Sequence, residues 1–227
     1  MMRDVAAIVP AAGRGVRLGA RESKAFVRVA GSPLIVHALR ALAKSPAIGW
    51  IIVAAPAADV ARMRRLVASA KLNKVSAVVA GGSSRSASVA NALAVVPKPA
   101  RWVLIHDGAR PCVTARLITE SITQARRYGA VACGLPASVT VKAVDGQQRV
   151  RLTLDREGVW FVQTPQVFRR DWLADALARI DGQLAQMPDD AAILEWAGYP
   201  VRMIPGDPLN VKVTTKDDLV IAEALAK

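Results

Sequence analysis

The residues best suited to phosphate chemistry lie in turns rich in small side chains. The first turn runs from Pro10 to Gly19, directly after an apolar segment, and has glycine at positions 13, 15 and 19. Small residues let backbone N–H groups approach a ligand closely, and clusters of such groups bind anions. Arg17 lies near the end of this turn, and Lys24 follows it. Two cations beside a backbone cradle suit a polyphosphate, although a solvated basic loop is the commoner outcome on charge alone.

The spacing of these glycines excludes two nucleotide-binding motifs. It misses the dinucleotide fingerprint by one position, and no acidic residue ends the second expected strand, where a ribose would be bound. No Walker A motif is present either. A nicotinamide enzyme is therefore disfavoured, and the chain is not a P-loop kinase.

A second turn, at 80–89, combines two glycines, four serines and Arg85. A helix needs one serine as an N-cap, so this number of hydrogen-bond donors favours binding of a base edge or a phosphate.

A third turn contains His106, Asp107 and Arg110. Asp107 follows a strand and is a candidate ligand for Mg²⁺ or substrate, although a local ion pair with Arg110 is equally consistent. His106 is expected to be a hydrogen-bonded core residue.

Short apolar segments that alternate with helical patterns supply the frame for these turns. Strands are expected at Val5–Val9, Trp50–Ala54, Val75–Val79, Trp102–Ile105, Val131–Leu135 and Asn210–Val213. Helices are expected at Pro33–Ala43, Ala58–Ala70, from the second turn to Leu93, and at Thr114–Tyr128, Trp172–Leu184 and Ala191–Ala197. This order predicts a doubly wound α/β fold with a mostly parallel sheet, whose ligands bind at the carboxyl ends of the strands.

Two further segments qualify this frame. Apolar and polar residues alternate in Val139–Val144 and in Arg149–Leu154, on either side of Asp145-Gly146. This pattern predicts a β-hairpin. This excursion, at about 137–156, could reach a partner subunit or pack on its own domain.

The last expected strand places Lys212 among apolar residues, which makes it a candidate phosphate ligand. A capping-box variant at Thr215 begins a final helix, and we expect residues 1–227 to form one domain.

Composition limits the partners. The 227 residues carry a net charge of +13, which attracts anions. Aromatic residues are only 4% and the basic residues are dispersed, so nucleic-acid binding is disfavoured. No apolar run is long enough to span a membrane. The only two cysteines, Cys112 and Cys133, indicate neither a disulfide scaffold nor a zinc site, and we expect a cytoplasmic protein.

Taken together, the motifs resemble a known family. Eight segments occur in the order and at the spacings of the 2-C-methyl-D-erythritol 4-phosphate cytidylyltransferases. They are Pro10–Leu18, Gly81–Val89, His106–Pro111, Thr140–Lys142, Arg156, Thr164-Pro165-Gln166, Asp189-Asp190 and Asn210–Thr214. The resemblance implies a Rossmann-like nucleotidyltransferase of non-mevalonate isoprenoid synthesis. It implies Mg²⁺-dependent attack of the methylerythritol phosphate on the α-phosphorus of CTP, with release of pyrophosphate.

The resemblance also implies roles for single residues. Arg17 and Lys24 would stabilise the transition state, and Arg156 and Lys212 would position the acceptor phosphate. The CTP and acceptor sites would include Pro10, Ala11, Ala12, Gly13, Gly82, Ser83, Arg85, Ser88, Asp107, Arg110 and Thr140, with Asp107 as the metal ligand. The hairpin would be the arm of a homodimer, so that Thr140 and Arg156 act in the neighbour's site.

Three positions depart from the family pattern. Ser23 replaces a proline before Lys24, Val139 replaces an aspartate before Thr140, and Pro188 replaces a threonine. The last two concern acceptor recognition, so a cytidylyltransferase for ribitol 5-phosphate or another polyol phosphate is an alternative. A non-catalytic, basic nucleic-acid-binding domain is a remote one.

Overall fold

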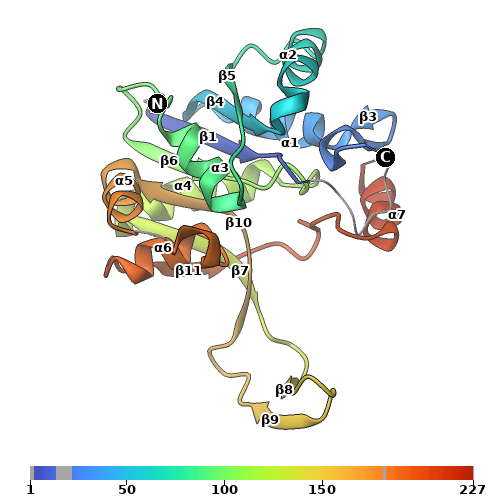
Figure 1. The fold of residues 1–227 in the computed structure, drawn as a ribbon, viewed down its shortest axis with the longest axis vertical. Coiled ribbons are helices and arrows are strands. Elements are labelled where there is room, and N and C mark those ends of the chain that lie inside the picture. The colour runs from blue at the N-terminus through green and yellow to red at the C-terminus, as the bar shows by residue number, and fades with distance from the viewer. Residues whose placement is uncertain (1–2, 14–21, 181–182, 227) are drawn as a thin grey trace.

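The computed structural model describes residues 3–13, 22–180 and 183–226, which are arranged around a seven-stranded sheet (Figure 1). Its order is β11-β7-β10-β6-β1-β4-β5. The strands are β1 (Val5–Pro10), β4 (Ile48–Ala55), β5 (Val75–Ala80), β6 (Trp102–Ile105), β7 (Ala130–Pro136), β10 (Trp160–Arg169) and β11 (Arg202–Pro205). Only β10 runs antiparallel to its neighbours β6 and β7, so the predicted mostly parallel sheet is confirmed.

Helices cover both faces of this sheet. They are α1 (Leu34–Lys44), α2 (Val60–Ser69), α3 (Arg85–Leu93), α4 (Ala115–Tyr128), α5 (Arg170–Arg179), α6 (Asp190–Trp196) and α7 (Lys216–Leu225), with short 3₁₀ turns η2 (Lys24–Phe26), η3 (Ala57–Asp59) and η4 (Leu184–Gln186). Side chains of β1 alternate between the two cores. Val5, Ala7 and Val9 pack with α1, α2 and α4, whereas Ala6 and Ile8 pack with α3, α5 and α6. Burial on both faces explains why β1 is apolar throughout.

Side-chain caps begin helices α4 and α7. Thr114 caps α4 by accepting from the Leu117 N–H at 3.2 Å. Thr215 and Asp218 form the predicted capping box at the start of α7, which packs beside a small hairpin of β2 (Arg28–Val29) and β3 (Ser32–Pro33). Such caps satisfy N–H groups that have no partner within the helix.

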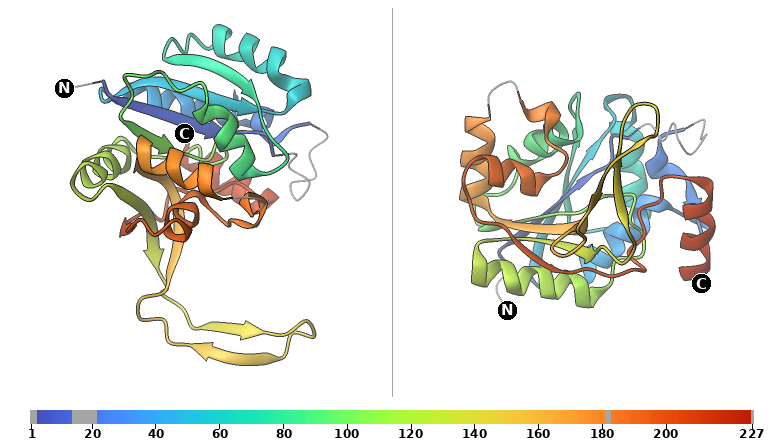
Figure 2. Two further views of the ribbon diagram at one scale, coloured as in Figure 1. Left: turned by 60° about the vertical axis from the view of Figure 1, so that its left-hand side comes forward. Right: turned by 90° about the horizontal axis from the view of Figure 1, so that it is seen from below.

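Residues 137–159 form an arm that leaves the sheet between β7 and β10. It carries the two-stranded hairpin of β8 (Val141–Val144) and β9 (Val150–Leu154), which confirms the predicted hairpin. Figures 1 and 2 show this arm extending away from the body of the molecule. It therefore does not pack along its length on its own domain.

Two sequence-based expectations about the fold are wrong, and two strands were missed. Asn210–Val213 is not a strand, because its backbone bonds to loops instead of a strand ladder: the Val213 N–H donates to the Ala109 carbonyl at 2.9 Å. The expected helix at 172–184 ends at Arg179. Strands β10 and β11 were not expected. In β10, the Thr164-Pro165 step falls where the pairing with β7 is irregular, and this hides the strand pattern.

Candidate functional site

A cavity of about 430 Å³ lies at the carboxyl ends of β1, β5 and β6. Of the residues expected to bind substrate or act in catalysis, its lining contains Pro10, Ala11, Ala12, Gly13, Lys24, Gly82, Ser83, Arg85, Ser88, Asp107 and Lys212. These residues come from segments more than 200 positions apart in the sequence, and the fold brings them together at the expected edge of the sheet. Sequence reasoning missed Leu34 and Thr214, which also line the cavity; Thr214 ends the motif that contains Lys212.

The first turn forms one wall with small side chains. The Ala11 N–H is held by the Ala54 carbonyl at 2.8 Å, which fixes the turn against the neighbouring strand. A Cβ added to Gly13 would meet no atom of the described residues within 4 Å, so they leave the space beside this glycine open. Arg17, together with the rest of residues 14–21, lies outside the described residues, and its role stays a prediction.

The second turn is shaped by close packing of its own atoms. A Cβ on Gly82 would lie 2.5 Å from the Ala87 Cβ, and one on Gly81 would lie 2.7 Å from the Ala12 Cβ. The Ser88 hydroxyl accepts from the Gly82 N–H at 3.0 Å and donates to the Ser84 carbonyl at 2.8 Å. Ser88 therefore holds the turn in shape, while Ser83 is exposed at the cavity.

The electrostatic centre of the cavity is Asp107. Its Oδ1 accepts from Arg85 Nε at 3.0 Å, and its Oδ2 lies 2.9 Å from Lys212 Nζ and 3.6 Å from Arg110 Nε. Burial favours the protonated acid, but the charges of Arg85 and Lys212 outweigh it and hold the pKa of Asp107 well below its usual range. This carboxylate is therefore ionised at neutral pH.

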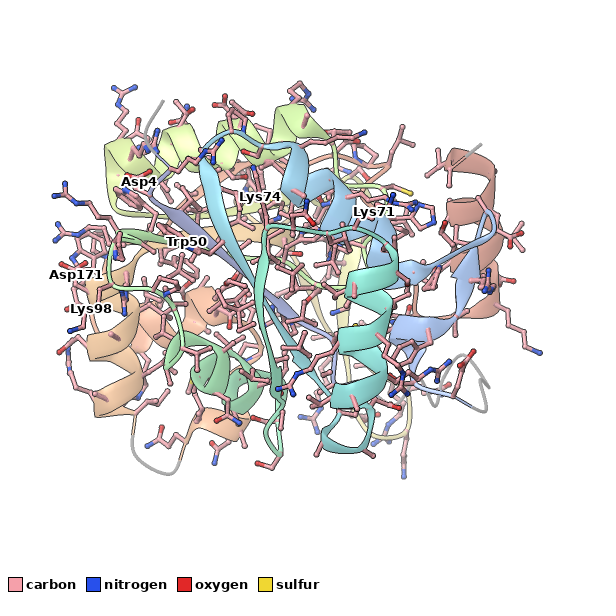
Figure 3. The ribbon with its side chains drawn as sticks, turned by 90° about the horizontal axis from the view of Figure 1, so that it is seen from above. Asp4, Trp50, Lys71, Lys74, Lys98 and Asp171 are labelled. Atoms are coloured by element: carbon pink, nitrogen blue, oxygen red, sulfur yellow. The ribbon has the colours of Figure 1, made fainter. Side chains whose placement is uncertain are left out.

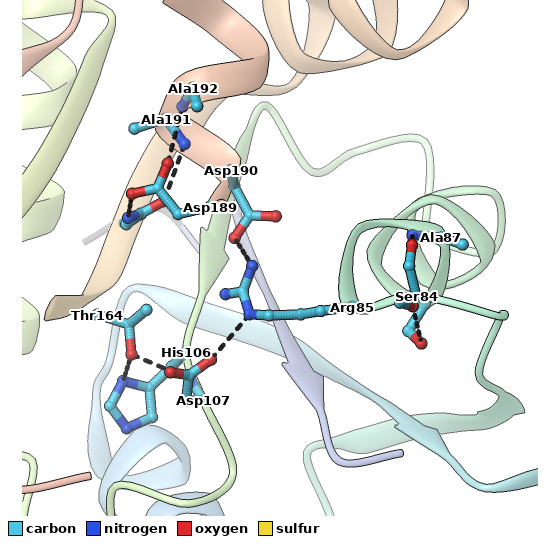
Figure 4. Close-up of polar contacts among 12 residues, drawn as sticks. Ser84, Arg85, Ala87, His106, Asp107, Thr164, Asp189, Asp190, Ala191 and Ala192 are labelled. Carbon is cyan, nitrogen blue, oxygen red and sulfur yellow. Dashed lines mark hydrogen bonds and ion pairs between the residues drawn. The ribbon is translucent and has the colours of Figure 1, made fainter. Parts of the chain in front are cut away.

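Arg85 links Asp107 to a second acid (Figure 4). Its Nη1 donates to Asp190 Oδ2 at 2.7 Å. Burial disfavours the charged guanidinium, yet the two carboxylates prevail and raise the pKa of Arg85 above its ordinary value. Burial also raises the pKa of Asp190, whose other oxygen has no hydrogen-bond partner within the part of the chain that the structure describes. Arg85 is thereby fixed in orientation at the cavity wall.

His106 is a core residue, as expected, and not a base facing the substrate. It is fully buried; its Nε2 lies 3.1 Å from the Arg110 carbonyl and its Nδ1 lies 3.1 Å from Thr164 Oγ1. Burial lowers the pKa of His106 to about 4, so the ring is neutral at pH 7. The same Thr164 hydroxyl accepts from the Asp107 N–H at 3.0 Å, and this chain of contacts positions the backbone of Asp107.

Three expected site residues do not line the cavity of their own chain. Arg110 is buried behind Asp107 and donates to the Asn210 carbonyl at 2.7 Å. Thr140 and Arg156 are exposed on the arm, where Arg156 donates to the Ser138 carbonyl at 3.0 Å. The structure thus gives Arg110 a supporting place beneath the cavity and leaves the two arm residues without a site in this chain.

The described residues contain no group of three or more His, Cys, Asp or Glu side chains able to hold a metal ion. Asp107 is the one acidic residue in the described lining of the cavity. Mg²⁺ binds through one or two carboxylates together with substrate phosphates, so a single ionised carboxylate beside a phosphate-sized space fits this ion.

The doubly wound sheet, the backbone turns and the cationic cavity at the strand ends define an α/β nucleotidyltransferase. A family model for 2-C-methyl-D-erythritol 4-phosphate cytidylyltransferase (IspD) matches residues 5–227. The chain belongs to this family.

Relatives and solved structures agree with this assignment. The 2-C-methyl-D-erythritol 4-phosphate cytidylyltransferase of Syntrophus aciditrophicus is 38% identical over all of this chain and 97% of its own length. The bifunctional enzyme IspD/IspF of Desulforudis audaxviator is 43% identical over 99% of this chain and 57% of its own length. The crystal structure of the Thermus thermophilus cytidylyltransferase superposes with a TM-score of 0.81 at 33% identity, covering 100% of this chain and 99% of that one.

No helix among the described residues is both long and apolar enough to cross a membrane. Cys112 and Cys133 are both unpaired thiols.

Proposed function

We propose that this protein transfers a cytidylyl group from CTP to 2-C-methyl-D-erythritol 4-phosphate in isoprenoid biosynthesis. The family match over residues 5–227 supports the reaction. The observation that carries the proposal for this chain is the cavity itself, where two small-residue turns face Asp107 and Lys212. Backbone N–H groups and cations are the groups that bind a triphosphate.

The reaction needs no nucleophile from the protein. A phosphate oxygen of the acceptor forms the new bond to the α-phosphorus of CTP, and the bond from that phosphorus to the bridging oxygen of the β-phosphate breaks, so pyrophosphate leaves with the electron pair. Catalysis is then positioning and charge neutralisation. We assign binding of the cytidine and the phosphates to Ala11–Gly13 and Gly82–Ser83. We assign stabilisation of the negative charge in the transition state to Lys24 and, by family resemblance, to Arg17.

Lys212 and Arg85 line the same cavity, but their side chains are held by different numbers of carboxylates. Arg85 is held by two carboxylates, whereas Lys212 pairs with Asp107 alone among the described residues. We assign Lys212 to the acceptor phosphate, which would share or replace Asp107 as its partner. Asp107 would hold Mg²⁺ together with phosphate oxygens, and the ion would supply positive charge to the phosphates.

The arm supports a homodimer. Its apolar side chains are exposed: Val144 is 53%, Val150 57% and Leu152 55% exposed. In a dimer they would be covered, and Thr140 and Arg156 would reach the partner's cavity. This arrangement would account for two site residues that have no cavity in their own chain.

The acceptor has an alternative. Val139 stands beside Thr140 on the arm, is 64% exposed and offers no carboxylate to a polyol hydroxyl. Ribitol 5-phosphate is therefore the acceptor to compare with methylerythritol phosphate. We keep the cytoplasm as the expected location because both thiols are unpaired.

Substitution of Lys212 tests the assignment of the cavity. Lys212→Gln should lower kcat/KM for the acceptor by about a hundredfold because a cation aimed at the reacting phosphate is lost. Lys216→Gln removes the same charge from an exposed position in the first turn of α7 and should leave the rate unchanged. Equal activities of the two variants, with both folded, would remove Lys212 from the site.

A further inference from the structure

A second cleft, of about 1100 Å³, lies at the end of the sheet opposite to the cavity just described. Its walls include Asp4, which precedes β1, Trp102 at the start of β6, and Gly129 before β7. The arm leaves from the other end of the sheet, after β7 (Figure 1). The proposed dimer contact and the proposed reaction therefore leave this cleft unused.

The cleft is strongly basic. Its lining includes six cations and two acids: Lys98, Arg101, Arg126, Arg127, Arg169 and Arg170, with Asp4 and Asp171. Three of the cations are already engaged. Arg126 pairs with Asp4 at 2.5 Å and Arg169 pairs with Asp171. Arg170 donates to the carbonyls of the loop before β6, among them Pro97 at 2.9 Å.

The other three cations, Lys98, Arg101 and Arg127, are exposed and have no acidic partner among the described residues. Figure 3 labels Lys98, Asp171 and Asp4 along one edge of the molecule, and all three line the cleft. Three unpaired positive charges around one concave surface repel each other, and an anion bound between them would remove that repulsion.

The aromatic residues of the cleft indicate what kind of anion fits. Trp172 stacks on Tyr199 with ring centroids 4.8 Å apart. The Arg169 guanidinium carbon also lies over the Trp172 ring, 5.1 Å from its centroid. Tyr128 carries two guanidinium groups, of Arg127 at 5.1 Å and Arg202 at 4.3 Å. The rings of Trp172 and Tyr128 are thus already engaged and are poorly placed to stack on bases, which single-strand binding requires. Recognition by charge is favoured instead.

We propose that this cleft is a second anion site, which binds the polyphosphate group of a small molecule through Lys98, Arg101 and Arg127. Several adjacent phosphates match several unpaired cations, and the large open volume leaves room for whatever organic group the phosphates carry. The inference rests on the described cleft and is independent of the reaction at the other end of the sheet.

Tryptophan fluorescence tests the proposal directly. Trp102 and Trp172 line this cleft, and no tryptophan is among the described residues of the first cavity. Inorganic tripolyphosphate, added at about 0.15 M salt to limit weak surface binding, should give a saturable change in emission. ATP in a parallel titration distinguishes a free polyphosphate from a nucleotide, and both ligands share the proposed chemistry.

Two triple variants of equal net charge serve as the comparison. Lys98→Gln/Arg101→Gln/Arg127→Gln should weaken tripolyphosphate binding by about tenfold or more, since three charge contacts are lost. Lys44→Gln/Arg65→Gln/Lys71→Gln removes three exposed cations outside the cleft and should bind as the parent does. Lys212→Gln, in the other cavity, should also keep the full response.

Three results would overturn the proposal. The first is no saturable response of the parent protein to either ligand. The second is equal weakening in the two triple variants, which would mean a general charge effect. The third is binding of duplex DNA with no binding of tripolyphosphate, which would assign the cleft to a nucleic-acid backbone. Circular dichroism confirms that each variant is folded.

Discussion

Asp107 organises the charge of the candidate cavity at the scale of single residues. Three cations surround its carboxylate, and two of them, Arg85 and Lys212, line the cavity. A lone carboxylate among substrate phosphates would repel them, but this one is neutralised before substrate arrives. Arrival of phosphates and Mg²⁺ would then redistribute partners among charges that are already in place, which is the preorganisation that phosphoryl transfer requires.

Gly13→Ala tests whether the open space in the first turn belongs to CTP. The added methyl meets no atom of residues 3–13, 22–180 and 183–226 within 4 Å, so we expect the protein to fold with unchanged stability. The same methyl should weaken CTP binding by about tenfold or more, because the backbone could no longer approach the ligand. Isothermal titration with CTP measures the effect.

Gly146→Ala is the matched control for this prediction. Gly146 lies in the arm turn, and a Cβ there also meets nothing within 4 Å. It should bind CTP as the parent does. Normal CTP binding by Gly13→Ala would show that the nucleotide does not pass close to this turn.

Because His106 is buried, we expect the stability of the protein to depend on pH in a specific way. Its pKa is lowered to about 4 by burial, whereas an unfolded chain takes up the proton near pH 6.5. Between these values the unfolded state binds more protons, so the free energy of unfolding should fall on acidification by about 1.4 kcal/mol per pH unit from this residue. Urea unfolding at pH 7 and pH 4.5 measures the slope.

His106→Gln should be less stable at pH 7 but should lose this part of the slope. His37→Gln, at the only other histidine, should retain it. An unchanged slope in His106→Gln would mean that the buried ring is not the group that takes up the proton.

At the scale of elements, the arm is the feature to which we assign a role in a second subunit. It extends from the body with exposed apolar side chains and carries Thr140 and Arg156 (Figure 2). If arms exchange between subunits, each active site combines residues of two chains. Loss of Arg156 in one subunit would then impair the site of the other.

Co-expression of Arg156→Gln and Lys212→Gln subunits tests this exchange. Each variant alone should be nearly inactive. Half of randomly paired dimers are mixed and hold one intact site of two, so about a quarter of the parent activity should return. No recovery in verified mixed dimers would show that both residues serve the same chain.

Regular elements with local patterns could be predicted from the sequence, and those defined by distant partners could not. The strand β1 and the hairpin of the arm follow from apolar runs and alternation. β10 pairs with two strands, but its Thr164-Pro165 step and buried glutamines disguise it. Asn210–Val213 has the apolar pattern of a strand, yet Asn210 donates to the Thr164 carbonyl at 2.7 Å and the segment stays irregular.

The candidate site was predictable where backbone turns carry it. The turns at 10–13 and 80–89 lie at the cavity, as expected. Lys212 lines the cavity, although the strand from which this position was expected is not formed. The contact of Arg85 with Asp190 could not be predicted, because the two residues lie more than 100 positions apart and only the folded chain brings them together.

At the scale of the whole molecule, the chain carries a net charge of +13, and basic side chains line pockets at both ends of its sheet. One end holds the cavity for the proposed transfer, and the other holds the basic cleft. Both would attract phosphorylated ligands, and a positive field speeds the arrival of such anions at low ionic strength. The surplus of basic residues thus fits small anionic ligands without a nucleic-acid partner.

The most direct test of the account is Mg²⁺-dependent release of pyrophosphate from CTP by the purified protein. Methylerythritol 4-phosphate and ribitol 5-phosphate are supplied in parallel reactions. We predict release with methylerythritol phosphate, little with ribitol phosphate, and none without acceptor. Release with ribitol phosphate alone would contradict the proposed acceptor, and silence in both reactions would contradict the proposed function.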